Sequence, residues 1–301
     1  MNRFLIGQYG GFDEAKYRRD FKPGFYGIEA CLFERDDEVE RLRREAEAAG
    51  FRIGVHFPFR TATTAVQGRD ALFLADDVTV REQAYALAER EIADLEPLRP
   101  SYILFHYPKP VILDDRVDWS NWRFDDRIEY VFESAYAAET LRERSEWLFA
   151  WLSRMGEAHR FTPVLELDAL NRYVYASDWL PSLLDRHPRI RLCLDTARLY
   201  LQDRIDPNFD AIEIVRRYAK YAKTIHLSNT RIDEQGRIAE KRRPVLPNQH
   251  PDEGWAPIER YLRIAVQENP DVKIMFEHRS DLATDEELEA CYRWVAALLT
   301  L

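Results

Sequence analysis

The chain has 301 residues, of which 46% are hydrophobic, and a net charge of -10. This length and apolar content suit one α/β barrel with a large core. Passive nucleic-acid binders neutralise phosphates with clustered Lys and Arg, so the acidic balance argues against that class.

The sequence carries no sign of export or membrane insertion. No apolar stretch reaches the length of a membrane span, and the first residues lead into a strand-like run without a signal-peptide core. Three cysteines, Cys31, Cys193 and Cys291, are far apart, which is typical of core packing in a reducing compartment. We therefore expect a soluble, cytoplasmic protein.

Strand and helix patterns alternate along the whole chain. Strand-like runs fall near 3–7, 26–30, 51–56, 101–106, 162–167, 190–195, 223–227 and 272–277. The clearest amphipathic helical patterns cover 36–49, 78–95, 134–158, 174–186, 209–221, 257–267 and 284–299. With no break in composition, this alternation predicts one domain over 1–301, a single (β/α)8 TIM barrel. A doubly wound open sheet is the alternative, but no glycine-rich turn follows the first strand to hold a dinucleotide.

Local signals mark several helix ends. Asp36 and Thr284 are expected to be N-caps, and Glu287 would complete a capping box with Thr284. Gly50 is expected to end the helix that begins near Asp36.

Three connections are longer than usual, after the third, fourth and seventh strands, at 57–77, 107–130 and 228–253. All three lie on the carboxyl side of strands, where barrel active sites are built. The third carries Arg231, the run Lys241-Arg242-Arg243, and His250. Their length and placement indicate function, although surface insertions are also tolerated there.

Four strand-like runs in the second half end in residues that can bind a metal ion: Glu166, Asp195, His226 and Glu277. A single acid at a strand end is more often a helix cap or an ion-pair partner. The recurrence of such residues at the same end of successive strands instead predicts a convergent site. Three carboxylates and one imidazole suit manganese, magnesium, cobalt or zinc.

Further candidates end the earlier strands. His56 and His106 close the third and fourth strands and would bind a second metal or a substrate hydroxyl, with a buried structural histidine as the alternative. Glu29, at the end of the second strand, either reaches the pocket or supports it from behind.

In order along the chain, these strand ends resemble those of the xylose-isomerase-like barrel superfamily, which holds sugar isomerases and epimerases together with endonuclease IV. The matching segments are Gly27-Ile28-Glu29, Val55-His56-Phe57-Pro58, Leu165-Glu166, Leu194-Asp195-Thr196, Ile225-His226-Leu227 and Phe276-Glu277. The resemblance implies that Glu166, Asp195, His226 and Glu277 bind one divalent ion and that the two glutamates exchange a substrate proton. In the endonuclease branch it implies a three-zinc cluster that also uses His56, His106 and His250.

Two positions depart from these patterns. Arg198 stands where the superfamily usually has a histidine, and Asn248 stands where the repair enzymes have an aspartate. Both changes argue against a three-zinc nuclease. A guanidinium beside the metal suits a substrate carboxylate or phosphate, and Arg231 would add to it; pairing of Arg198 with a neighbouring carboxylate is the alternative.

The sequence thus predicts a divalent-metal-dependent isomerase or epimerase of a small sugar, sugar acid or sugar phosphate. Glu166 and Glu277 would be its catalytic residues, moving a proton through an ene-diolate. We expect a carbohydrate partner, and neither nucleic acid nor a membrane. The alternatives are an endonuclease IV-like phosphodiester hydrolase acting on abasic DNA and a catalytically inactive barrel.

Overall fold

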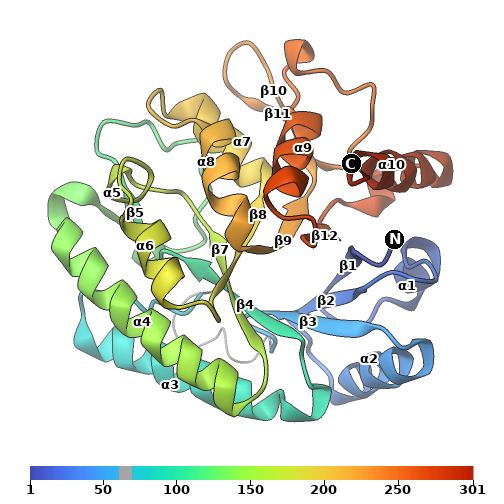
Figure 1. The fold of residues 1–301 in the computed structure, drawn as a ribbon, viewed down its shortest axis with the longest axis horizontal. Coiled ribbons are helices and arrows are strands. Elements are labelled where there is room, and N and C mark those ends of the chain that lie inside the picture. The colour runs from blue at the N-terminus through green and yellow to red at the C-terminus, as the bar shows by residue number, and fades with distance from the viewer. Residues whose placement is uncertain (61–69, 301) are drawn as a thin grey trace.

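Eight parallel strands close into a barrel in the computed structural model, which describes residues 1–60 and 70–300 (Figure 1). In spatial order they are β1 (Phe4–Tyr9), β12 (Lys273–Phe276), β9 (Ala222–Leu227), β8 (Arg191–Asp195), β7 (Thr162–Leu167), β4 (Tyr102–Tyr107), β3 (Arg52–His56) and β2 (Gly27–Cys31). The predicted (β/α)8 fold is confirmed.

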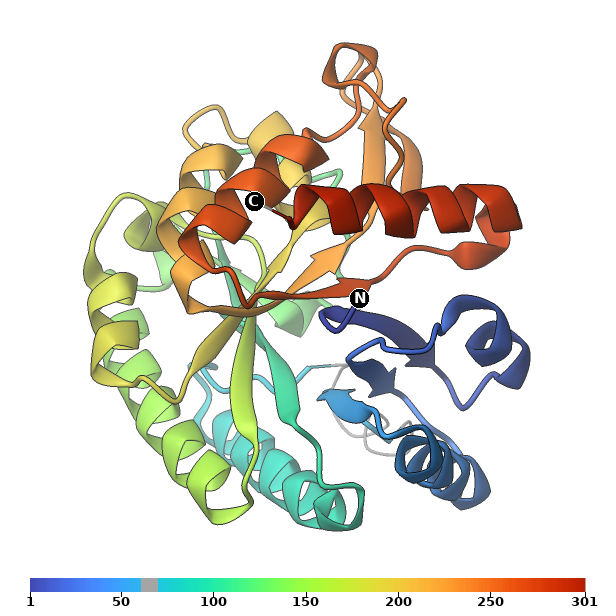
Figure 2. The same cartoon turned by 45° about the vertical axis from the view of Figure 1, so that its right-hand side comes forward.

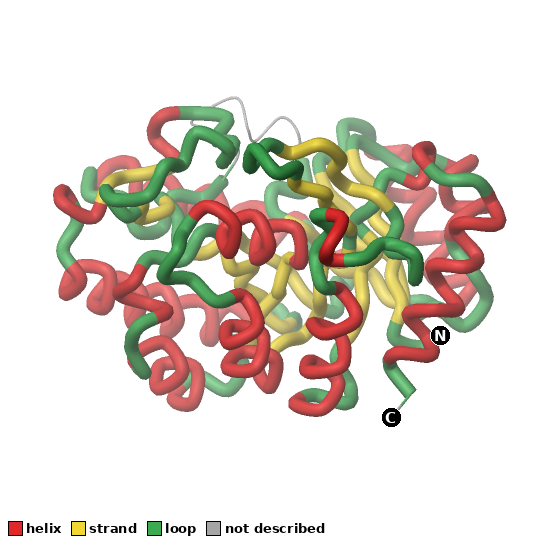
Figure 3. The backbone as a smooth tube through the Cα atoms, turned by 90° about the horizontal axis from the view of Figure 1, so that it is seen from above, coloured by secondary structure: helices red, strands yellow, loops and turns green. Residues whose placement is uncertain are grey.

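Helices cover the outside of the barrel (Figure 3). They are α1 (Glu14–Asp20), α2 (Asp36–Ala49), α3 (Val78–Asp94), α4 (Ala138–Ala158), α5 (Arg172–Tyr175), α6 (Trp179–Arg186), α7 (Thr196–Ile205), α8 (Ala211–Tyr218), α9 (Ile258–Glu268) and α10 (Asp285–Leu298). Short 3-10 helices occur at Glu96–Leu98, Arg127–Glu129, Glu133–Ala135, Ala219–Tyr221, Pro251–Glu253 and Ser280–Leu282. No helix in the described part of the chain is both long and apolar enough to cross a membrane.

Helix ends follow local chemistry. Thr284 caps α10 and forms the predicted capping box with Glu287. Gly50 ends α2 with φ 71°, a conformation that costs glycine little. The prediction for Asp36 was wrong: it is the first helical residue, and Arg35 occupies the cap position without a side-chain cap bond. Asp36 still complements the helix dipole as an acidic residue in the first turn, so the sequence signal lies one position after the cap itself.

The alternation of side chains along each strand positions the site. Inside the barrel, Val164 of β7, Cys193 of β8 and Met275 of β12 pack in one buried cluster. Successive side chains on a strand point to opposite faces, so the residue two positions further on also faces inward. Glu166, Asp195 and Glu277 hold those positions, at the carboxyl end of the barrel.

The long connections carry small sheets. After β4, β5 (Val111–Leu113) pairs with β6 (Tyr130–Phe132), and after β9, β10 (Asn229–Ile232) pairs with β11 (Ile238–Arg243). The β10–β11 hairpin, in orange, stands above the barrel in Figure 2. The predicted loop 57–77 includes residues 61–69, which lie outside the described residues.

Candidate functional site

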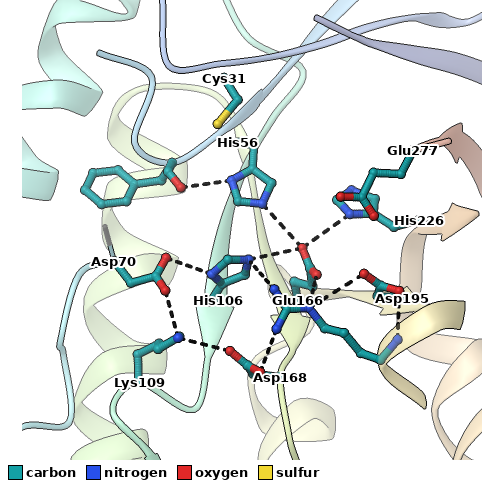
Figure 4. A network of polar contacts seen from close by, with 12 residues as sticks. Cys31, His56, Asp70, His106, Lys109, Glu166, Asp168, Asp195, His226 and Glu277 are labelled. Carbon is teal, nitrogen blue, oxygen red and sulfur yellow. Dashed lines mark hydrogen bonds and ion pairs between the residues drawn. The ribbon is translucent and has the colours of Figure 1, made fainter. Parts of the chain in front are cut away.

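The acidic and imidazole side chains expected at the strand ends lie together at the carboxyl end of the barrel (Figure 4). Asp195, His226 and Glu277 each offer a ligand atom, and these atoms lie within 4.8 Å of one another. Glu166 Oε2 lies 3.3 Å from Nδ1 of His226. Asp195, His226 and Glu277 therefore form one group of potential ligands, and Glu166 adjoins that group through His226.

A second group adjoins the first through the same glutamate. His56, His106 and Glu166 also offer ligand atoms within 4.8 Å of one another. The Nε2 atoms of His56 and His106 lie 3.4 and 3.6 Å from Glu166 Oε2. Glu166 therefore lies between two sets of potential ligands and could bridge them.

The donor set fits a divalent cation. Glu166 Oε2 is buried and has no hydrogen-bond partner among the described residues, although three imidazole rings surround it. A buried carboxylate oxygen with only these longer imidazole contacts is incompletely satisfied, and a cation at this point would satisfy it. Oxygen and imidazole ligands suit magnesium, manganese, cobalt or zinc.

The charges at the cluster also favour a bound divalent cation. Burial raises the pKa of Asp195 to about 7, and the charges of Glu277 and Glu166 add to that rise. Burial also opposes ionisation of Glu166, but the charges of His226 and His106 outweigh it and hold its pKa well below the usual range. Besides burial, the raised pKa of Asp195 reflects repulsion by Glu277 and Glu166, and a divalent ion would relieve that repulsion.

Arg198 reaches the same carboxylates from the first turn of α7. Its Nη1 lies 2.7 Å from Asp168, and its Nε lies 3.1 Å from Glu166 and 3.6 Å from Asp195. Burial lowers its pKa, but the charges of Asp168 and Glu166 more than compensate, so the guanidinium stays charged. Arg198 thus pairs with neighbouring carboxylates, which was the alternative interpretation of this residue.

A buried lysine that the sequence analysis missed supports both sides of this network. Lys109 is 4% exposed, and its Nζ lies 2.8 Å from Asp70 and 3.1 Å from Asp168. Asp70 in turn lies 2.7 Å from Nδ1 of His106, which turns Nε2 of that ring toward Glu166. Lys109 therefore positions His106 and Asp168 through their carboxylate contacts.

The strand pattern contained a signal for part of this network. Asp168 follows Glu166 by two positions, so it shares the inward direction of that residue. Lys109 lies three positions after His106, in the connection that follows β4. Asp70 carried no comparable signal, because it lies in a long loop rather than at a strand end.

Glu29 lies behind the site. It is fully buried, accepts a hydrogen bond of 2.6 Å from the hydroxyl of Tyr102, and lies 3.1 Å from Nε2 of His226. Such a contact fixes the orientation of an imidazole whose other nitrogen faces the cluster.

A cleft of about 530 Å³ opens beside the cluster. Acidic residues of the site and several cations line it, among them Asp195, Glu277, Arg198, Lys241 and Arg242. Nη2 of Arg242, from the β10–β11 hairpin, lies 3.2 Å from Glu277. The cations give the cleft groups that can bind an anionic substituent of a ligand.

Two predicted residues lie apart from the cluster. Arg231 pairs with Glu240 at 3.0 Å within the hairpin, and His250 is exposed at the start of the 3-10 helix Pro251–Glu253. Within residues 1–60 and 70–300, neither belongs to the metal-compatible groups or to the cleft lining. The structure therefore does not bring them to the site.

Comparisons with known proteins find solved structures that share this fold. No protein-family model and no curated protein matches the sequence. Among solved structures, the TTHB071 protein from Thermus thermophilus, soaked with zinc chloride, is 18% identical with TM-score 0.61, over 98% of this chain and 97% of that one. The D-psicose 3-epimerase with D-tagatose from Clostridium cellulolyticum is 16% identical with TM-score 0.59, over 99% and 100%.

The IolI protein with a bound zinc atom is 11% identical with TM-score 0.60, over 99% of this chain and 98% of that one. Other structures with this fold are described as a xylose isomerase domain protein and an L-ribulose 3-epimerase. The chain thus shares its TIM-barrel fold with these epimerase and xylose isomerase-like structures, the resemblance that its strand ends predicted.

Proposed function

We propose that this chain is a metal-dependent isomerase or epimerase of a small sugar, sugar acid or sugar phosphate. The observation that carries the proposal is the group of ligand atoms from Asp195, His226 and Glu277 beside a cleft, which Glu166 adjoins through His226. The epimerases that share the fold, one of them in complex with D-tagatose, support the substrate class.

The chain's own residues would bind the substrate and move the proton. A divalent ion held by the four residues would polarise a substrate carbonyl and acidify the neighbouring C–H. Glu166 or Glu277 would remove that proton, and the same or the other glutamate would return it to the ene-diolate. Arg242 contacts Glu277 at the cleft and is placed to bind a substrate anion nearby.

Solvent deuterium provides the test. The metal-loaded protein is incubated in D2O with a panel of ketoses, including D-tagatose, and their phosphates. Deuterium is expected at the carbon beside the carbonyl, because the glutamate that removes the proton exchanges it with solvent. The Glu277→Gln variant should lose exchange while keeping its fold, since the amide cannot accept the proton.

Asp185→Asn is the matched control, because Asp185 is an exposed carboxylate on α6 outside the cleft. It should exchange at the normal rate. Full exchange activity in Glu277→Gln, measured beside a folded circular-dichroism spectrum, would reject the role of Glu277. A lack of exchange across the panel would remove the support for an ene-diolate mechanism.

The group His56, His106 and Glu166 favours a second candidate, a two-metal phosphodiester hydrolase. Metal analysis after purification distinguishes the two functions. One ion per chain favours the isomerase, whereas two ions together with hydrolysis of bis-(p-nitrophenyl) phosphate favour the hydrolase. The acidic net charge of -10 argues against DNA as its substrate.

A further inference from the structure

A second cavity, of about 390 Å³, opens at the opposite end of the barrel, where the strands begin. Its lining includes Thr162 of β7, Arg191 of β8, Lys223 of β9 and Lys273 of β12. These four strands are consecutive neighbours in the barrel. The cavity therefore carries an arc of cations, in a chain whose overall charge is negative.

Two side chains of this arc point toward the barrel axis. Arg191 and Lys273 each precede by two positions a residue of the buried interior cluster, Cys193 and Met275. Arg191 and Lys273 therefore point inward, as Cys193 and Met275 do, because side chains alternate between the two faces of a strand. The same strands end in Asp195 and Glu277, four residues further on. Four residues of strand span about 13 Å, so the cavity is distinct from the candidate metal site.

A bulge adds the third cation. In the pairing of β8 with β9, Leu192 faces Ala222 and Cys193 faces Thr224, so Lys223 is an extra residue without a partner. Bulges of this kind re-aim a side chain and occur next to functional sites. The ammonium groups of Lys223 and Lys273 lie 6.0 and 5.0 Å from the ring centroid of the same residue, Tyr26. The bulge thus brings the two lysines to one aromatic ring.

These cations are half-buried, so water solvates their charges only in part. Within the described parts of the chain, no carboxylate lies within ion-pair distance of Arg191, Lys223 or Lys273; the exposed Asp271 lies at the rim. The guanidinium of Arg191 donates to the carbonyls of Lys220 and Ala222. Burial lowers the pKa of Lys223, and the neighbouring charge of Arg191 lowers it further. An anion between these groups would offset their mutual repulsion.

We propose that the cavity formed by Thr162, Arg191, Lys223 and Lys273 at the amino-terminal end of the barrel binds a phosphate-type oxyanion. A guanidinium, two ammonium groups and a hydroxyl supply charge-assisted donors for such a ligand. This site is independent of the proposed catalytic function, because it shares no residue with the candidate metal cluster.

Calorimetric titration with inorganic phosphate tests the proposal. The wild-type chain should bind phosphate saturably in a chloride buffer at neutral pH. Lys223→Gln and Lys273→Gln should each bind it about ten- to a hundredfold more weakly, since each removes a charge-assisted hydrogen bond. Arg154→Gln, which removes an exposed charge from α4, is the matched control and should bind normally.

Two further measurements separate this site from the cleft and from a structural role. Arg242→Gln alters the cleft at the other end, so it should remove only phosphate bound there and leave intact the binding that Lys223→Gln weakens. Without phosphate, Lys223→Gln should melt at the same or a higher temperature than the wild type, because it removes a like charge. A lysine that only stabilises the barrel end would instead lower the melting temperature.

The proposal is overturned if the wild type binds no phosphate, if Lys223→Gln and Lys273→Gln bind it normally, or if Arg242→Gln alone loses it. Should the lysine variants fail to fold, a wild-type crystal soaked in tungstate decides the question. Anomalous density beside Arg191 and Lys273 supports the site, and density confined to the cleft overturns it.

Discussion

Arg198 brings a permanent positive charge to the place where a divalent ion would be bound. Its Nε lies 3.1 Å from Glu166 and 3.6 Å from Asp195, two of the four candidate ligands. The guanidinium therefore competes electrostatically with a metal for those carboxylates. It also lines the cleft, where it can pair with an anionic group of a ligand.

Replacing Arg198 with Gln should therefore change metal binding and catalysis in opposite directions. We expect the affinity for Mn2+ to rise on the order of tenfold, because a repelling charge is removed. We expect kcat/KM for an anionic substrate to fall by a similar factor of about ten, because a charge-assisted contact is lost. Calorimetry and steady-state kinetics measure the two effects.

Arg204→Gln serves as the control for this variant, because Arg204 is an exposed residue of the same helix, α7. It should change neither quantity. Weaker metal binding in Arg198→Gln would mean that the guanidinium holds Glu166 and Asp195 in place for the ion rather than competing with it.

At the level of single residues, the sequence identified side chains at strand ends and missed those in loops. Glu166 and His226 could be found because a parallel barrel delivers every strand end to one face. Asp70 and Lys109 approach the cluster from connections, and their contact depends on the path of the loops. The third long connection also carries Arg231 and His250, which lie outside the cleft because Arg231 pairs with Glu240 within the hairpin and His250 is exposed beyond it.

Among the elements, α10 begins with a complete capping box, in which Thr284 and Glu287 exchange side-chain and backbone hydrogen bonds. Thr284→Ala removes one half of this exchange. It should lower the free energy of unfolding by about 1 kcal/mol. Thr79→Ala is the control, because Thr79 is exposed in the first turn of α3 and Asp77 provides the cap there. Urea denaturation measures both, and equal losses in the two variants would contradict the capping role of Thr284.

Element boundaries followed the sequence where a cap or a strand end gave a clear signal. The predicted helix over 174–186 is divided into α5 and α6, with the break at residues 176–178. The sequence pattern gave no clear signal for α7, because this helix begins at Thr196, directly after β8, and Asp195 both ends the strand and caps the helix. Because Asp195 has both roles, no loop separates β8 from α7, and the loop residues that usually mark such a boundary are missing.

At the scale of the whole molecule, the barrel interior is built in layers along its strands. An apolar layer that includes Val164, Cys193 and Met275 separates the acidic cluster at one end from the basic cavity at the other. The ends of β1 and α10 also meet, since Arg3 donates to the carbonyl of Leu299, and the two termini lie near each other (Figure 1). Closure of the barrel thus connects the first and last elements with the strands that carry the candidate ligands.

A metal bound at the carboxyl end of the closed barrel should stabilise the entire fold. The candidate ligands come from β7, β8 and β9 and from the end of β12, so they gather only when the barrel is closed. An ion that binds the folded chain alone adds about 2.7 kcal/mol at a free concentration a hundredfold above its Kd. For a chain of this size we expect the melting temperature to rise by roughly 4 °C over the chelator-treated protein. Differential scanning calorimetry with Mn2+ or Zn2+ measures the rise, and Asp195→Asn should reduce it while Asp185→Asn should retain it. Equal melting temperatures with and without the ion would show that these residues do not hold it, because binding that is confined to the folded state must stabilise that state.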